Sequence, residues 1–207
     1  MKILSFDIGT VNLAYCYLNY DQKIHKINII EWNIINLKKQ TNGSITPISL
    51  INLIQNKYKY FNSSDVILIE NQSPQNSQMR IIQTILHTYF YTYDILENNT
   101  SNHQKVYICN PKDKYKDYVF EGKNTYYERK KASIVMATEY LTEICTNNAK
   151  NTLNEWIDNK QINKSSFYDD NDKNTQFLRQ FVSYKKKDDL ADSLLQIKAW
   201  ICTSKLI

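Results

Sequence analysis

Three short apolar segments follow one another at the start of the chain, in an alternating pattern that favours strands over helices. They are Lys2–Ile8 (KILSFDI), Ala14–Leu18 (AYCYL) and Lys26–Trp32 (KINIIEW), with turn-forming residues between them. The simplest arrangement of three such segments is an antiparallel three-strand meander. Whatever this chain folds into must therefore accommodate a β-sheet that begins at its first residues.

Helical and strand patterns alternate over the rest of the chain. Apolar spacing predicts helices over 48–60, 76–93, 125–145 and 188–202, and strands at Val66–Glu70 and Lys105–Cys109. A meander followed by alternating elements predicts an α/β fold, with a mixed sheet (antiparallel meander plus parallel strands) flanked by helices. A length of 207 residues suits a single domain over 1–207, and the polar stretch at about 146–184 is predicted to be an insertion with some helix.

Composition excludes several classes of protein. Three glycines cannot build the repeated glycine-rich phosphate loops of an actin-like or sugar-kinase ATPase. Four scattered cysteines, without a CxxC pair or zinc-finger spacing, indicate reduced thiols and a reducing intracellular compartment. We expect no secretory leader and no membrane partner, because no apolar run approaches the roughly 20 residues that a membrane span needs. The net charge of +5 permits a polyanionic partner without requiring one.

Carboxylates interrupt the apolar runs at three places. Asp7 lies inside the first strand, Glu70 ends the run VILIE, and Asp188, Asp189 and Asp192 open the last helix. A charge in a sheet interior costs several kcal/mol unless it is paired or bound to a cation. Each acid also has an ordinary explanation: a turn residue, an exposed strand end, or helix N-terminal charges that the macrodipole favours.

Together the acids suggest a metal site. If the first strand is central and Val66–Glu70 lies beside it, Asp7 and Glu70 meet, and a helix crossing the sheet edge adds Asp189 and Asp192. Such clustered oxygen donors repel one another unless they hold cations, and they suit Mg²⁺, with Mn²⁺ as a substitute left open. Two ions about 4 Å apart can hydrolyse a phosphodiester, since one activates the attacking water and the other stabilises the leaving 3′ oxygen.

Four blocks in the chain resemble a known family. FDIGTVNLAYCYL, LIENQSPQN, TYYERKKASIVMATEYL and KKKDDLADSLL occur in the order and spacing of the poxvirus Holliday-junction resolvases, which are RuvC-like members of the RNase H-like superfamily. The resemblance implies an RNase H-like fold and a metal quartet of Asp7, Glu70, Asp189 and Asp192. It also implies that a lysine contacts the scissile phosphate. That lysine is Lys130 or Lys131, and the spacing slightly favours Lys131.

Basic and aromatic residues near these acids fit a DNA substrate. The residues expected to bind backbone phosphates are Lys112, Lys114, Arg129, Lys130, Lys131, Lys185, Lys186 and Lys187. For the segment 112–123, where acids interleave, a solvated loop is an equally good interpretation. Four tyrosines are candidates for stacking on unpaired bases, with ordinary packing as the alternative for each: Tyr115, Tyr118, Tyr126 and Tyr127.

The leading hypothesis is a Mg²⁺-dependent endonuclease that resolves four-way DNA junctions in recombination and replication, including concatemer resolution in a viral setting. A junction presents two near-equivalent strands, so we expect a two-fold symmetric homodimer. The helix at 76–93 is the candidate interface, because Met79, Tyr89, Phe90 and Tyr91 are more apolar surface than one buried face of a helix requires. The alternative is that the insertion covers both faces of this helix. The alternatives are an RNase H-type nuclease of RNA–DNA hybrids and a non-catalytic junction-binding protein.

Overall fold

The structure is a computed structural model that describes residues 1–97, 104–120, 125–145, 173–184 and 187–204. Its strands are β1 (Lys2–Ile8), β2 (Asn12–Asp21), β3 (Lys26–Asn36), β4 (Val66–Glu70) and β5 (Lys105–Cys109). Its α-helices are α1 (Leu37–Gln40), α2 (Pro47–Lys57), α3 (Ser77–Glu97), α4 (Tyr126–Ile144), α6 (Lys173–Ser183) and α7 (Lys187–Thr203). Two 3₁₀ turns, η1 (Lys59–Ser63) and η2 (Asp113–Tyr115), complete the described elements.

The five strands form one mixed sheet in the order β3-β2-β1-β4-β5. The β1–β2 and β2–β3 pairs are antiparallel, whereas β4 pairs parallel with both β1 and β5. The predicted meander and the parallel strands that follow it are therefore confirmed. The second strand is longer than the sequence pattern indicated, because its ladder to β3 continues from Asn12 to Asp21.

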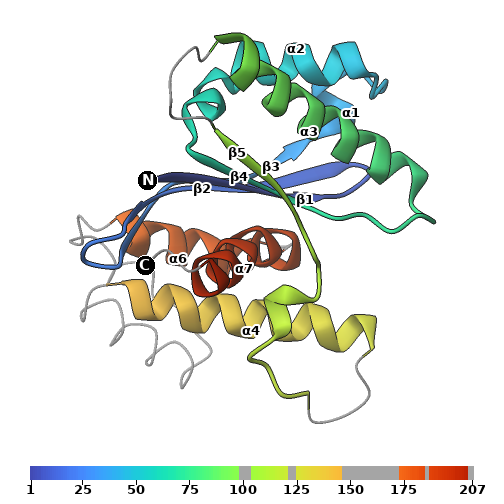
Figure 1. Cartoon of the computed structure of the whole chain (residues 1–207). Helices are drawn as coiled ribbons and strands as arrows, with labels where there is room; N and C mark the ends of the chain where they lie inside the picture. Colours follow the sequence, from blue (N-terminus) through green and yellow to red (C-terminus); the bar gives the residue numbers. More distant parts are fainter. Residues whose placement is uncertain (98–103, 121–124, 146–172, 185–186, 205–207) are drawn as a thin grey trace.

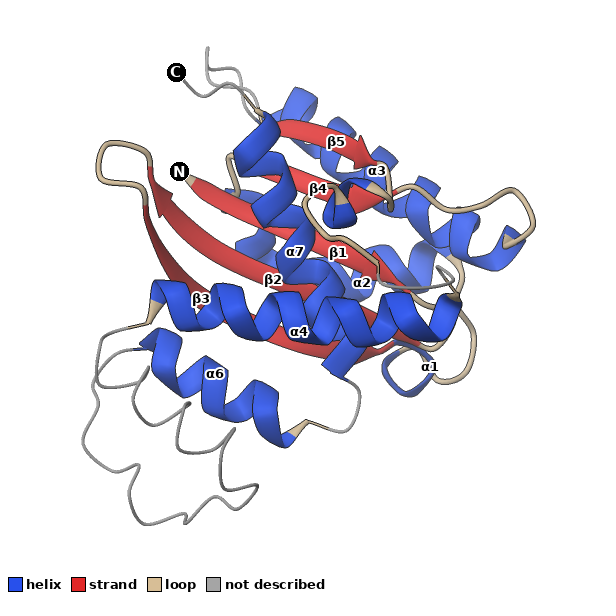
Figure 2. Ribbon diagram, turned by 90° about the horizontal axis from the view of Figure 1, so that it is seen from below, coloured by secondary structure: helices blue, strands red, loops and turns tan. Residues whose placement is uncertain are grey.

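Helices cover both faces of the sheet (Figure 1). One face packs against α1, α2 and α3, with a core that includes Leu4, Phe6, Phe61 and Phe90. The other face packs against α4, α6 and α7, which lie below the sheet in Figure 1 and in front of it in Figure 2. Because both faces are covered, the central strands are apolar on both sides, which explains their nearly continuous apolar runs.

The predicted helices are present with different ends. The helix expected over 48–60 ends at Lys57, and the chain continues as η1. Helix α3 extends beyond the predicted end at residue 93 to Glu97. The polar stretch contributes α6, and residues 146–172 lie outside the described part of the chain. None of the described helices is both long and apolar enough to span a bilayer.

A single tryptophan fixes α7 against the sheet. Trp32 on β3 donates its indole N–H to the carbonyl of Leu190 at 3.0 Å and to Ser193 Oγ at 3.1 Å. Its ring also stacks on Phe181 of α6, with centroids 4.9 Å apart. Ala191 is fully buried, as its small side chain predicts for a close helix–sheet contact. These contacts set the position of the acidic first turns of α7.

Candidate active site

The alternation of side chains along two adjacent strands brings Asp7 and Glu70 together. Ile3 of β1 and Leu68 of β4 face the α7 side of the sheet, and Asp7 and Glu70 follow them at even spacing. In the parallel register Phe6 pairs with Ile69, so the next residue on each strand lies beside the other. The two carboxyl groups are close enough for each to change the pKa of the other.

Burial and a neighbouring acid make Asp7 difficult to ionise. Removal from water and the charge of Glu70 raise the pKa of Asp7 well above its ordinary value. Burial acts in the same direction on Glu70, but the charge and hydrogen bond of Lys114 outweigh it, and the pKa of Glu70 is lowered. Of this pair, Asp7 is therefore protonated more readily than Glu70.

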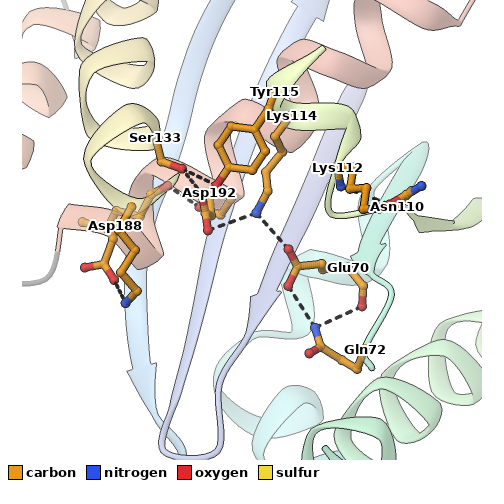
Figure 3. Close-up of polar contacts among 12 residues, drawn as sticks. Glu70, Gln72, Asn110, Lys112, Lys114, Tyr115, Ser133, Asp188 and Asp192 are labelled. Carbon is orange, nitrogen blue, oxygen red and sulfur yellow. Dashed lines mark hydrogen bonds and ion pairs between the residues drawn. The ribbon is translucent and has the colours of Figure 1, made fainter. Parts of the chain in front are cut away.

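Lys114 is the cation at the centre of the site. Its Nζ lies 2.8 Å from Oε1 of Glu70 and 3.0 Å from Oδ2 of Asp192, and Figure 3 shows the side chain between the two acids. The residue is only 6% exposed. Burial lowers the pKa of Lys114, but the charges of the carboxylates, Asp192 first, raise it above its ordinary value. The lysine therefore stays charged and neutralises the acids.

Neighbouring side chains orient two of the carboxylates. Ser133 of α4 donates its hydroxyl to Oδ1 of Asp192 at 2.6 Å, and the Tyr115 hydroxyl lies 2.8 Å from Ser133 Oγ. Gln72 donates its side-chain amide to Oε2 of Glu70 at 3.0 Å. Gln72 is itself held from α3, because its backbone N–H donates to a side-chain oxygen of Gln83 at 2.7 Å. Contacts that start from η2, α3 and α4 thus fix the carboxylates of Glu70 and Asp192.

The N-terminal turn of α7 carries a second charge pair. Asp188 forms an ion pair with Lys130 of α4. Burial raises the pKa of Asp188, but the hydrogen bond and charge of Lys130 lower it overall. Asp189 accepts a long hydrogen bond, 3.5 Å, from the side-chain amide of Asn12 on β2. The site therefore joins β1, β2, β4, α4 and α7.

All four predicted metal-binding acids line one cleft of about 940 Å³. Its other polar lining includes Asp188, Lys112, Lys114, Arg129, Lys130 and Asn110. Aromatic side chains of Tyr115, Tyr118, Phe120 and Tyr126 also line it. The sequence hypothesis that these acids gather at one edge of the sheet agrees with this placement.

The donor chemistry of the cleft suits a hard divalent cation. Glu70 and Asp192 pair with one ammonium ion, and the charge of Asp7 also acts on it, so the site already concentrates negative charge on one cation. In the part of the chain that the structure describes, no three His, Cys, Asp or Glu side chains are arranged to hold a metal ion as they stand. With Lys114 between Glu70 and Asp192, the carboxylates are arranged around an ammonium group instead.

The predicted basic residues do not share one environment. Lys112, Arg129 and Lys130 line the cleft. Lys112 is exposed, whereas Arg129 and Lys130 are half-buried. Lys131, which the sequence slightly favoured, points to solvent outside the cleft, because the inward face of α4 is taken by Ala132 and Ser133. Lys187 is half-buried in α7, whereas Lys185 and Lys186 lie outside the described residues.

Sequence reasoning placed Lys114 among phosphate-binding lysines or on a solvated loop. The structure buries it within the acid cluster instead, because three carboxylates need a cation there. The roles of Gln72, Ser133 and Tyr115 in orienting the acids were also missed. The only signal for Gln72 was its position two residues after Glu70, and Ser133 gave none, since a serine within a helix is ordinary.

Comparison with known proteins identifies the family. Residues 3–206 match the model described as mitochondrial resolvase Ydc2 / RNA splicing MRS1. The chain belongs to this resolvase family. Its fold is also similar to the fowlpox virus resolvase, solved with its substrate Holliday junction DNA, at a TM-score of 0.59 and 24% identity. That match covers 99% of this chain and 100% of the fowlpox chain.

Two further relatives are more distant or match only in part. The yeast mitochondrial Holliday junction resolvase Ydc2 gives a TM-score of 0.56 at 18% identity, covering 96% of this chain and 78% of the yeast chain. An uncharacterized protein of Acanthamoeba polyphaga mimivirus is 55% identical over 40 residues, which are 18% of this chain and 10% of that protein. The likeness to the fowlpox and yeast structures shows that this chain has the RNase H-like fold of the resolvases.

Proposed function

We propose that this protein is a divalent-metal-dependent endonuclease that cuts four-way DNA junctions. The observation that carries the proposal is that Glu70 and Asp192 pair with one buried cation, next to Asp7, in a cleft with basic walls. A protein that only bound DNA would gain nothing from acids that face phosphates. Family membership alone does not decide, because the family description also includes an RNA-splicing protein.

The acids are the proposed metal ligands. Asp7, Glu70, Asp189 and Asp192 would hold Mg²⁺, which supplies an activated water and stabilises the leaving 3′ oxygen when it is bound. Ser133 and Gln72 keep two of these carboxylates in fixed orientations, as partners of metal ligands commonly do. The raised pKa of Asp7 means that a proton leaves this site when the carboxylate binds a cation.

The basic residues bind and orient the substrate. Lys112, Arg129 and Lys130 lie on the walls of the cleft and face the same space as the acids. Positive charge at these positions holds the backbone phosphates over the carboxylates, and such binding weakens steeply with salt. Selectivity for a junction then rests on shape and phosphate spacing and not on base edges.

A homodimer would supply two such clefts to one junction. Helix α3 has no charged residue between Arg80 and Asp94. Ile81, Tyr91 and Ile95 are 52%, 57% and 54% exposed, and Thr84 and Thr88 lie between them at coiled-coil spacing. Of the four residues predicted for this interface, Tyr89 and Phe90 are instead buried in the protein's own core and Met79 is half-buried. Tyr91 alone of the four is exposed.

Removal of one acid tests the catalytic part of the proposal. Asp7→Asn keeps the size of the side chain and removes its charge, so nicking of a synthetic four-way junction in Mg²⁺ should fall by at least about 100-fold. Asp117→Asn is the matched control, since Asp117 is exposed and outside the cleft lining. Equal activity of the two variants would contradict the assignment of Asp7, and junction binding without cutting by the unmodified protein would indicate a binding protein.

A further inference from the structure

One wall of the cleft is aromatic. Tyr118 and Phe120 pack edge to face, with ring centroids 4.9 Å apart, and Phe120 lies 5.8 Å from Tyr115. Tyr126, the first residue of α4, also lines the cleft and is 67% exposed. A nuclease that touched only phosphates would need charged groups here, so the rings require a separate explanation.

Tyr126 is connected directly to the acidic end of the cleft. The Nζ of Lys130 lies 4.9 Å from the centroid of the Tyr126 ring, a cation–π contact, and the same ammonium group pairs with Asp188. One residue further along α7 is Asp189, a proposed metal ligand. A planar group stacked on Tyr126 would therefore be separated from the proposed cleavage site only by the side chains of Lys130 and Asp188.

The structure distinguishes the four tyrosines that the sequence could not. The Tyr115 hydroxyl is engaged with Ser133, which orients Asp192, so this residue supports the acids. Tyr127 is 76% exposed but does not line the cleft. Tyr118 and Tyr126 line the cleft, and Tyr126 is the more exposed of the two.

The occupant that matches these rings is a nucleobase. In continuous duplex DNA the faces of the bases are covered by their neighbours, whereas a base at a branch point can leave the stack. Every base offers a π-face to an aromatic side chain, and such stacking does not depend on sequence. Lys112, Arg129 and Lys130 in the same cleft match the phosphates on either side of that base.

We propose that Tyr126, which lines the same cleft as Phe120 and Tyr118, receives an unstacked nucleobase of the branch point next to the scissile phosphate. This inference rests on the proposed junction nuclease and adds how the protein distinguishes a junction from linear duplex. Tyr126 is in this account a specificity residue, and linear duplex has no base to offer it.

A double-mutant cycle between protein and DNA tests the inference. Binding is measured in EDTA, with an intact four-way junction and with junctions that carry an abasic site at each nucleotide flanking the branch point in turn. For the unmodified protein, one abasic position should weaken binding about 10-fold, the usual effect of losing one stacked base. Tyr126→Ala should weaken binding to the intact junction by the same factor, and the abasic site should then cost nothing further.

Two control variants keep the result interpretable. Tyr127→Ala removes a neighbouring exposed ring and should behave as the unmodified protein does. Tyr126→Phe retains the ring and should restore the sensitivity to the abasic site. Independent, additive losses from Tyr126→Ala and the abasic site, or no loss at all, would overturn the inference while junction cutting stands. Failure of the unmodified protein to cut an intact junction in Mg²⁺ would instead reject the proposed function on which the inference rests.

Discussion

The ammonium group of Lys114 and the carboxylate of Glu70 form a buried ion pair at 2.8 Å, although the two residues are 44 positions apart in the chain. The same ammonium group pairs with Asp192. Lys114 therefore compensates two acids that would repel each other in its absence. Mg²⁺ bound at these carboxylates would provide the same compensation, so lysine and metal share one electrostatic role.

Loss of Lys114 should make folding depend on the metal. Lys114→Met should lower the free energy of unfolding by about 3–5 kcal/mol without metal, because breaking a buried pair leaves its acids uncompensated. Added Mg²⁺ should recover more stability in this variant than in the unmodified protein. Urea denaturation with and without Mg²⁺ measures both effects. Lys112→Met, which changes an exposed lysine, is the control and should stay within about 0.5 kcal/mol. A variant that Mg²⁺ does not stabilise would contradict the shared role.

Asp7 should reduce stability at neutral pH. Its pKa in the folded protein is raised, so its favourable contribution is complete below the unfolded pKa and is lost as pH rises through the folded value. Asp7→Asn should therefore raise the free energy of unfolding at pH 7.5 in EDTA by about 1 kcal/mol, as removal of a strained active-site group often does. Urea denaturation across pH should show the difference shrinking as pH falls. A destabilised variant at pH 7.5 would show that Asp7 is not under this strain.

Lys130 and Lys131 should differ in their effect on catalysis. Lys130 lines the cleft and pairs with Asp188, whereas Lys131 points to solvent. Lys130→Ala should reduce single-turnover junction cleavage by about 100-fold, the scale of a lost charge-stabilising contact. Lys131→Ala should change the rate by no more than about 2-fold. The opposite order would restore the preference that the sequence suggested.

Self-association should depend on the exposed stripe of α3. Tyr91→Glu or Ile81→Glu should convert a dimer to a monomer in sedimentation, because each places a charge in the proposed apolar interface. Ile24→Glu is the control, since Ile24 is 67% exposed on the β2–β3 hairpin. A monomeric unmodified protein, or a dimer that survives both α3 changes, would exclude this interface.

Most of the sheet and the positions of the acids could be predicted from local patterns. Period-two alternation and the order of the strands are enough to bring Asp7 beside Glu70 once β4 is placed next to β1. The first two turns of α7 then contribute Asp189 and Asp192 because helical spacing sets them on one side. These features depend on short stretches of sequence whose periodicity is strong.

The features that were missed depend on contacts between distant segments. Lys114 lies in a run of alternating charges, a pattern typical of a solvated loop, and only the folded chain brings it to the acids. The orientation of α4, which places Lys130 in the cleft and Lys131 outside it, depends on how the helix packs on α7. The sequence does not show how many side chains the second apolar core, on the α3 face of the sheet, can bury. Tyr89 and Phe90 were therefore predicted to lie in an interface, although they belong to that core.

The most direct test of the central claim is a comparison of cleavage substrates with the unmodified protein in Mg²⁺. A synthetic four-way DNA junction, its linear duplex counterpart and an RNA–DNA hybrid are incubated in parallel, each with an EDTA control. The account predicts paired, symmetric nicks in the junction alone, and none in EDTA. If the protein cuts the RNA–DNA hybrid and leaves the junction uncut, that result contradicts the account. The same acids would then belong to an RNase H-type enzyme.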